Sequence, residues 1–144
     1  MKIFDCFMYF DEDIVLDLRL NFLNKYVDYF VIVESSFTHK GDKRKLKFDL
    51  RKFNNFRNKI IYVTFDEEPK NVEEVFDTDD EGEKSRKYIL NAAYRENGQR
   101  NHILKGLNKA QDEDMILISD VDELPNLENI DFNKIKKDII LFRQ

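Results

Sequence analysis

A single cysteine, Cys6, occurs among the 144 residues of this sequence, so no internal disulfide can form. Nothing in the chain therefore demands an oxidising compartment. Cys6 lies in an apolar run, where we expect it to pack as a small hydrophobic residue rather than to act as a nucleophile. Histidine and cysteine occur nowhere at the spacing of a zinc site. These shortages exclude a disulfide scaffold and a Cys/His zinc module.

Long hydrophobic runs and an excess of positive charge are also missing. No segment reaches the ~18 apolar residues of a membrane span, and no signal-peptide pattern opens the chain. We expect a soluble or cytoplasmic protein with no membrane segment, and any anchor would lie outside this sequence. The net charge of −5 argues against nucleic acid as the main partner. The sequence gives no indication of the oligomeric state.

What the sequence does contain is a series of short apolar runs separated by helical patterns. Apolar runs without polar alternation predict buried strands, and they occur at Ile3–Tyr9, Tyr29–Glu34, Lys59–Phe65, Met115–Ile118 and Asp138–Gln144. Strand, helix and strand in this order predict a parallel α/β sheet. The length suits one domain, residues 1–144. Because the last run ends the sequence, we expect the domain to be incomplete at its C-terminus.

The first predicted helix follows the acidic segment Asp11–Asp13, whose side chains suit a helix N-terminus. We expect this helix to extend to about Tyr26. Its core-facing residues recur at helical spacing; they are Leu16, Leu20, Leu23 and Val27, with Val15, Leu18 and Phe22 widening the same face.

Four further features are expected between the strands. Ser35–Lys47 is polar and basic, with a turn at Gly41–Asp42, and its basic residues either meet phosphates or form a solvated loop face. The other three are a short helix within Phe48–Phe56, an acidic and partly helical surface excursion at Asp66–Lys87, and helical segments at Ser85–Tyr94 and Gln99–Ala110 that Gly98 interrupts.

The most informative stretch is Asp114–Pro125, DMILISDVDELP, where an apolar run passes directly into acidic residues. The run predicts a strand in the middle of a parallel sheet, and ligands of such sheets bind at the carboxyl ends of the strands. In extended chain, Asp120 and Asp122 project to the same side. Two adjacent carboxylates repel unless a cation lies between them, and oxygen ligands suit Mg²⁺ or Mn²⁺. A D-x-D at a strand end is also common in ordinary loops and caps.

Four stretches together make the chain resemble glycosyltransferase family 17, the β-1,4-mannosyl-glycoprotein 4-β-N-acetylglucosaminyltransferase family. They are IFDCFMYFDEDIVLDLRLNFL at Ile3–Leu23, VDYFVIVESSFTHKG at Val27–Gly41, YRENGQRNHILKGL at Tyr94–Leu107 and ISDVDELP at Ile118–Pro125. Their order matches that of the family, and they cover most of the chain. Four motifs in order are far more specific than the D-x-D alone.

The resemblance implies a GT-A-like, Rossmann-like fold with a mostly parallel sheet flanked by helices. It also implies an inverting, metal-dependent glycosyltransferase that moves a sugar from a nucleotide-sugar donor, most simply N-acetylglucosamine from UDP-GlcNAc, to a glycan acceptor. The divalent cation would be Mn²⁺ or Mg²⁺. The family's acceptor-binding half and catalytic base are expected beyond the matched stretch.

The same resemblance suggests roles for individual residues. Asp122 is expected to bind the metal directly, with Asp120 on the metal or the ribose, and Glu123 is expected to bound the donor-sugar pocket; Asp122 and Glu123 are the catalytic candidates. The expected substrate-binding residues are Glu34, Ser35, Thr38, Arg100 and Asp120. Two of these have an alternative, since Arg100 also fits an ion pair with Glu96 at i,i+4 and Ser35 also fits a turn.

Three other kinds of site or function compete with this one. In phosphatases of the haloacid dehalogenase type, a D-x-D lies on the first strand and is followed by Gly and Thr, unlike here. A calcium loop is disfavoured because the glycine that it needs is missing from DVDELPN. The stronger alternative is a non-catalytic, truncated GT-A domain that binds a nucleotide or a partner protein, through the exposed edge of an unfinished sheet.

Overall fold

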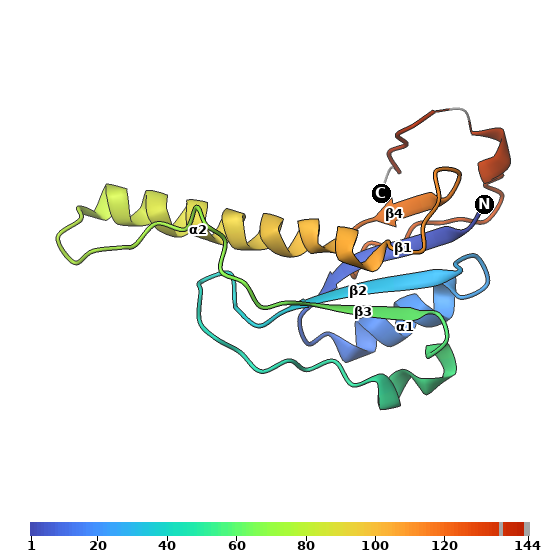
Figure 1. Cartoon of the computed structure of the whole chain (residues 1–144), viewed down its shortest axis with the longest axis horizontal. Coiled ribbons are helices and arrows are strands. Elements are labelled where there is room, and N and C mark those ends of the chain that lie inside the picture. Colours follow the sequence, from blue (N-terminus) through green and yellow to red (C-terminus); the bar gives the residue numbers. More distant parts are fainter. Residues whose placement is uncertain (136, 143–144) are drawn as a thin grey trace.

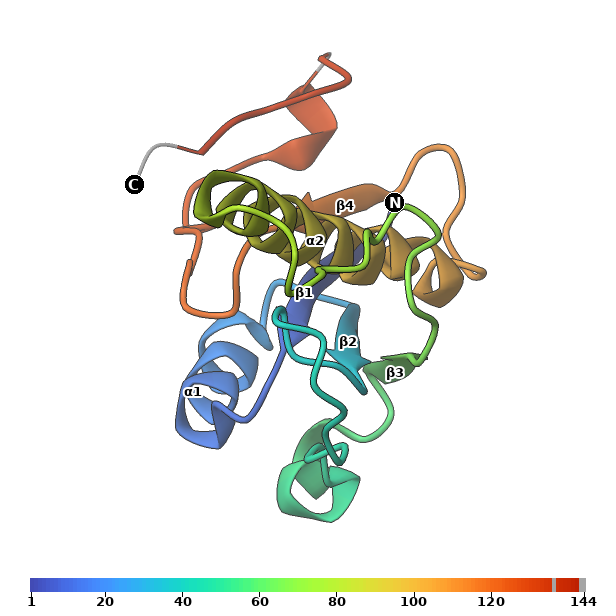
Figure 2. The ribbon, with the colours of Figure 1, turned by 90° about the vertical axis from the view of Figure 1, so that its left-hand side faces the viewer.

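A computed structural model describes residues 1–135 and 137–142 of the chain, and it has a four-stranded, all-parallel sheet in the order β3-β2-β1-β4. The strands are β1 (Ile3–Tyr9), β2 (Tyr29–Ser35), β3 (Ile60–Phe65) and β4 (Met115–Ile118). The helices are α1 (Asp13–Leu23) and α2 (Glu81–Asn101), with short 3-10 helices η1 (Leu50–Phe56), η2 (His102–Gly106) and η3 (Phe132–Lys134). The predicted α/β class with a parallel sheet between helices is confirmed (Figures 1 and 2).

The sheet has a hydrophobic core on each face, because successive side chains of a strand point to opposite sides. On one face, Phe7 and Tyr9 of β1 pack with the buried leucines of α1 and with Phe53 and Phe56 of η1. On the other face lie Phe4, Cys6, Val31, Val33, Phe65 and Ile103. Figure 2 shows the two layers, with α1 and η1 on one side of the sheet and α2 on the other. Cys6 is buried, as predicted.

The first helix is shorter than predicted, and its buried face is narrower than predicted. It ends at Leu23 rather than near Tyr26. Its predicted core residues Leu16, Leu20 and Leu23 are fully buried, but Leu18 and Phe22 are 56% and 46% exposed. A helix that covers one face of a sheet buries a single stripe, so the prediction that these two residues widen the core-facing side was wrong.

The strand that leads into the acidic stretch lies at an edge of the sheet, not in its middle. β4 pairs only with β1 among the described residues, with Met115 opposite Ile3 and Ile118 opposite Cys6. Leu117 is buried whereas Ile118 is 58% exposed. An unbroken apolar run predicts which residues are buried, but it does not predict how many neighbouring strands the strand has. In this sheet the central strands are β1 and β2.

Gly98 does not interrupt the second helix, contrary to the prediction. α2 continues through it to Asn101, and η2 follows, so a separate helix at Gln99–Ala110 is not formed. A Cβ atom at Gly98 would lie 2.7 Å from Cζ of Phe65 at the end of β3. The glycine therefore lets α2 approach the sheet closely, which explains its place inside a helix.

The acidic excursion is irregular from residue 66 to residue 80 and lies beside α2, which extends well past the sheet (Figure 1). Glu73 forms an ion pair with Arg86 at 2.8 Å, and Asp79 forms one with Lys87 at 2.7 Å. The side chain of Asn91 donates to the carbonyl of Glu73 at 2.7 Å and accepts from its N–H at 2.9 Å. These contacts, rather than apolar packing, hold the excursion to the helix.

We expect acid to release this excursion before the sheet unfolds. The hydrogen bond from Arg86 lowers the pKa of Glu73, and those from Lys87 and the Phe76 N–H lower the pKa of Asp79. Carboxyl groups with a lowered folded-state pKa stabilise the contact above their unfolded pKa and lose that contribution as the pH falls through the folded value. Amide hydrogen exchange between pH 6 and pH 3, corrected for intrinsic rates, should rise selectively in residues 69–80. Equal changes in this segment and in β2 would contradict the expectation.

The last predicted strand is absent from the residues that the structure describes. Residues 138–142 form no strand, and Ile139 and Leu141 are 79% and 88% exposed. Residues 143 and 144 of the prediction lie outside the described residues. Within the described ranges, no helix is both long enough and apolar enough to cross a membrane.

Candidate active site at the carboxyl end of the sheet

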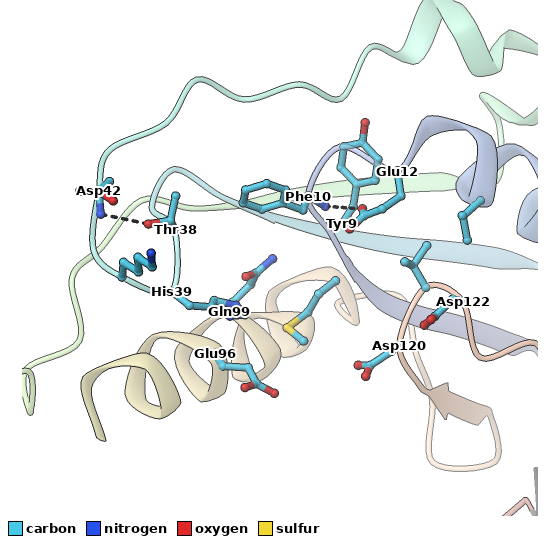
Figure 3. Close-up of a pocket in the computed structure, with 14 residues that line it drawn as sticks. Tyr9, Phe10, Glu12, Thr38, His39, Asp42, Glu96, Gln99, Asp120 and Asp122 are labelled. Atoms are coloured by element: carbon cyan, nitrogen blue, oxygen red, sulfur yellow. Dashed lines mark hydrogen bonds between the residues drawn. The ribbon is translucent and has the colours of Figure 1, made fainter. Parts of the chain in front are cut away.

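A cavity of about 750 Å³ opens where β1 and β2 end. Its walls come from the end of β1 and the start of α1, from the loop after β2, from α2, and from the turn after β4 (Figure 3). The lining side chains are Met8, Tyr9, Phe10, Glu12, Val15, Thr38, His39, Lys40, Asp42, Glu96, Gln99, Asp120, Val121 and Asp122. This is the end of a parallel sheet at which ligands bind.

The acidic stretch forms a turn rather than the extended chain that was predicted. The N–H of Glu123 donates to the carbonyl of Asp120 at 3.0 Å, and the N–H of Asp120 donates to Oε2 of Glu123 at 3.0 Å. Asp120 and Asp122 nevertheless line the same cavity (Figure 3). The turn, and not the two-residue repeat of a strand, therefore places both carboxylates at the cavity.

The carboxylates of Asp120 and Asp122 differ in their surroundings. Asp120 is paired with Arg100, whose Nη2 lies 3.1 Å from its Oδ1. Asp122 is exposed, and no hydrogen bond or ion pair to its carboxylate is found among the described residues. Asp122 is therefore the carboxylate that is ready to bind a cation without first breaking a contact.

Arg100 has the helical partner that the sequence suggested for it and a second carboxylate partner that it did not suggest. Its Nη2 lies 3.1 Å from Glu96 one helical turn earlier, which confirms the i,i+4 pair, and 3.1 Å from Asp120 of the acidic turn, although Arg100 itself does not line the cavity. The guanidinium thus links α2 to the acidic turn. Its side chain is 38% exposed, so its position can respond to a ligand.

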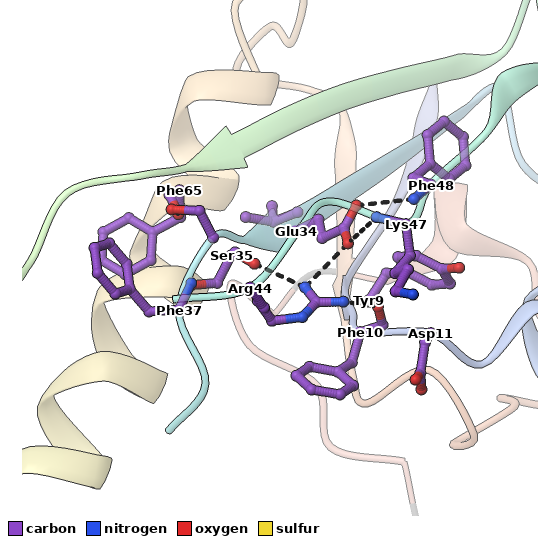
Figure 4. Close-up of polar contacts among 12 residues, drawn as sticks. Tyr9, Phe10, Asp11, Glu34, Ser35, Phe37, Arg44, Lys47, Phe48 and Phe65 are labelled. Atoms are coloured by element: carbon purple, nitrogen blue, oxygen red, sulfur yellow. Dashed lines mark hydrogen bonds and ion pairs between the residues drawn. The ribbon is translucent and has the colours of Figure 1, made fainter. Parts of the chain in front are cut away.

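Glu34, a predicted substrate-binding residue, is fully buried and has several partners inside the protein (Figure 4). Its oxygens accept from the N–H groups of Lys47 and Phe48 at 2.7 and 3.0 Å and from the Tyr62 hydroxyl at 2.8 Å. Arg44 lies 3.0 Å away as its ionic partner. Burial and the bond to Glu34 raise the pKa of Tyr62. In this structure Glu34 anchors the loop after β2.

Ser35 and Thr38 shape that same loop. Oγ of Ser35 accepts from the N–H of Phe37 at 3.0 Å, which confirms its alternative as a turn residue. Oγ1 of Thr38 accepts from the N–H of Asp42 at 3.1 Å, and Gly41 has a φ of +100°. A turn is present as predicted, but it is centred on His39–Lys40, just before the predicted Gly41–Asp42, and Gly41 ends it. Of the two, Thr38 lines the cavity.

Sequence reasoning missed two residues beneath the acidic turn, Asp5 and Arg19. Both are fully buried, and Arg19 donates to both oxygens of Asp5 at 2.8 and 2.7 Å. Its Nη1 also donates to the carbonyl of Asp120 at 2.7 Å. A signal was present, because an arginine between Leu16 and Leu20 on the apolar face of a helix and an aspartate inside an apolar strand both need a partner.

A divalent cation would find two carboxylates here rather than a complete set of protein ligands. Among the described residues, no group of three or more His, Cys, Asp or Glu side chains is arranged to hold a metal. Magnesium is usually held by one or two carboxylates together with substrate phosphates and water. Asp120 and Asp122 therefore fit a cation that arrives with a diphosphate, and not one that the protein holds alone.

Comparison with known proteins gives one family and two relatives. The family model described as "Glycosyltransferase family 17" matches residues 1–140. The chain is 29% identical over 125 residues to the β-1,4-mannosyl-glycoprotein 4-β-N-acetylglucosaminyltransferases of Homo sapiens and Rattus norvegicus. Each alignment covers 84% of this chain and 21% of the relative, so the chain spans about a fifth of their length. No solved structure matches the chain.

Proposed function

Because this chain belongs to glycosyltransferase family 17, we propose that it binds a nucleotide sugar and transfers the sugar to a glycan acceptor. UDP-N-acetylglucosamine is the donor that we propose, since the relatives are named as N-acetylglucosaminyltransferases. The reaction would be an inverting transfer, in which an acceptor hydroxyl attacks the anomeric carbon as the nucleoside diphosphate leaves.

The observation that carries this proposal is the pair of carboxylates, Asp120 and Asp122, on the wall of a cavity at the carboxyl end of a parallel sheet. The cavity volume of about 750 Å³ lies within the usual range for small-molecule sites. A diphosphate would be repelled by two bare carboxylates, so the same observation supports a shared Mn²⁺ or Mg²⁺.

In this proposal four residues at or beside the cavity have a stated task. Asp122 binds the cation directly, and Asp120 binds the cation or the ribose. When bound, the cation neutralises charge that develops on the leaving diphosphate. Arg100 exchanges its contact with Asp120 for the phosphate oxygens, which a guanidinium holds bidentately. Thr38 supplies a hydroxyl at the opposite rim.

The position of Glu123 favours a second candidate function, in which the chain binds the nucleotide sugar without transferring the sugar. Its Oε2 already accepts from the N–H of Asp120 at 3.0 Å, so it shapes the turn instead of facing an acceptor. An inverting transfer needs a group that takes the acceptor proton. Slow hydrolysis of UDP-N-acetylglucosamine with Mn²⁺ would favour transfer, whereas tight binding without turnover would favour the second function.

The test is a thermal-shift and calorimetric titration with Mn²⁺, with UDP, and with both. Because the cation is shared, UDP and Mn²⁺ together should stabilise the chain more than the sum of their separate effects. At a ligand concentration of ~100 Kd the gain is about 2.7 kcal/mol, or roughly 5–10 °C in Tm. Asp122→Ala should remove the combined shift.

The matched control is Asp112→Ala, which removes an exposed carboxylate in the loop before β4, outside the cavity lining. It should leave the combined shift unchanged. A combined shift that survives Asp122→Ala, or one that is absent from the unaltered chain, would count against the proposed function.

A further inference from the structure

Arg19 occupies an unusual place for an arginine, because its side chain is fully buried on the apolar face of α1. Arginine is almost never fully buried unless it is paired. Nε and Nη2 donate to the two carboxylate oxygens of Asp5. Burial raises the pKa of Asp5, and the hydrogen bonds from Arg19 oppose that rise. One edge of the guanidinium is therefore hydrogen-bonded to Asp5 on strand β1 of the sheet.

The other edge of the guanidinium holds the acidic turn by its backbone. Nη1 donates to the carbonyls of Asp120, Val121 and Glu123 at 2.7, 3.1 and 3.0 Å. Nη2 donates to Oγ of Ser119 at 2.7 Å, and this hydroxyl donates to the carbonyl of Glu123 at 3.1 Å. Three of the four backbone carbonyls from Asp120 to Glu123 therefore accept hydrogen bonds from the same guanidinium group.

The direction of these carbonyls determines where the side chains of the turn point. Val121 is buried beside Arg19, whereas Asp120 and Asp122 are exposed and line the cavity. A change in the path of this backbone would move both carboxylates relative to the cavity. The buried guanidinium therefore holds the backbone from which both carboxylates reach the cavity, without contacting either carboxylate.

Stability alone does not account for this arrangement. A buried ion pair is about as stable as a well-packed apolar pair, and often less so. An apolar residue cannot direct several carbonyl groups at once, and lysine lacks the planar set of N–H donors by which Arg19 reaches six acceptor atoms. We propose that Arg19 is a positioning residue, which acts through Asp120 and Asp122 on the binding of a cation and diphosphate; this inference depends on the proposed function.

The test compares Arg19→Lys with Leu23→Ala. Leu23 is the control because it is fully buried in the last turn of the same helix but its side chain forms no hydrogen bonds. Both variants should lower Tm. Only Arg19→Lys should weaken binding of UDP in saturating Mn²⁺, by about 10–100-fold, the usual loss when a group that orients metal ligands is altered. Ser119→Ala, which removes one acceptor of Arg19 and is less buried, should weaken binding in the same direction.

A double-variant measurement separates positioning from general destabilisation. In an Asp122→Asn background, Arg19→Lys should cause little further loss of binding, because its effect passes through Asp122. Normal binding by both Arg19→Lys and Ser119→Ala, or full loss again in the Asp122→Asn background, would overturn the inference while leaving the proposed function intact. An unaltered chain that binds neither Mn²⁺ nor UDP would overturn both.

Discussion

Asp5→Asn is expected to destabilise the protein by about 3–5 kcal/mol, a large part of the 5–15 kcal/mol that typically holds a domain folded. The substitution preserves the shape of the side chain but removes the charge that balances Arg19, and both residues are fully buried. Arginine cannot discharge by losing its proton. The cost is therefore that of an uncompensated positive charge in the interior, and urea unfolding monitored by circular dichroism should measure it.

Two controls accompany this prediction. Asp17→Asn lies on the exposed side of α1 and should change the free energy of unfolding by less than ~0.5 kcal/mol. The double variant Asp5→Leu with Arg19→Met should not restore the stability of the unaltered chain, because it removes both charges but leaves the carbonyls of the acidic turn without their donor. A loss below ~1 kcal/mol for Asp5→Asn would mean that the pair is not a buried ionic contact in solution.

Gly106→Ala should destabilise the protein by about 1–3 kcal/mol, the usual cost of overpacking a core. A Cβ atom at this position would lie 2.3 Å from Cγ1 of Val31 and 3.3 Å from Cγ2 of Val63. Val31 is fully buried on the central strand β2. Because the sheet cannot yield, η2 would have to move outward, and thermal or urea unfolding should detect the loss.

The steric origin of this effect has its own test. Val31→Ala in the Gly106→Ala background removes the atom that would clash, so the double variant should lose less than the sum of the two single losses. Gly82→Ala is the comparison at an exposed position of α2, where the only close atom is Oδ1 of Asp80 at 3.2 Å. It should be neutral or slightly stabilising. Additive losses would contradict the proposed clash.

The parts of the fold that the sequence predicts well are those governed by local pattern. The runs at Ile3–Tyr9, Tyr29–Glu34 and Lys59–Phe65 become β1, β2 and β3 within one residue. Gly98 shows where such reasoning fails. Glycine has a low helix propensity, but at this position its lack of a side chain lets α2 pack closely against Phe65. The edge position of β4 was equally hidden, because pairing depends on the whole sheet.

The candidate site was only partly predictable for the same reason. The D-x-D and Arg100 could be found because their side chains are charged, and in the structure Asp120 and Asp122 line the cavity while Arg100 contacts Asp120. The contact between Arg19 and the carbonyl of Asp120 joins residues 101 positions apart, and no local pattern encodes it. Glu34 is a second example. Its place at the end of β2 was predicted correctly, but its partners Arg44 and Lys47 lie in a loop whose course the sequence does not reveal.

The walls of the cavity come from segments near residues 8–15, 38–42 and 96–122, so no early part of the chain contains the site. A partly folded chain with only the first βαβ unit would have no surface for a ligand to recognise. A bound ligand would consequently prolong the lifetime of the native chain by slowing unfolding, and it would leave the rate of folding unchanged.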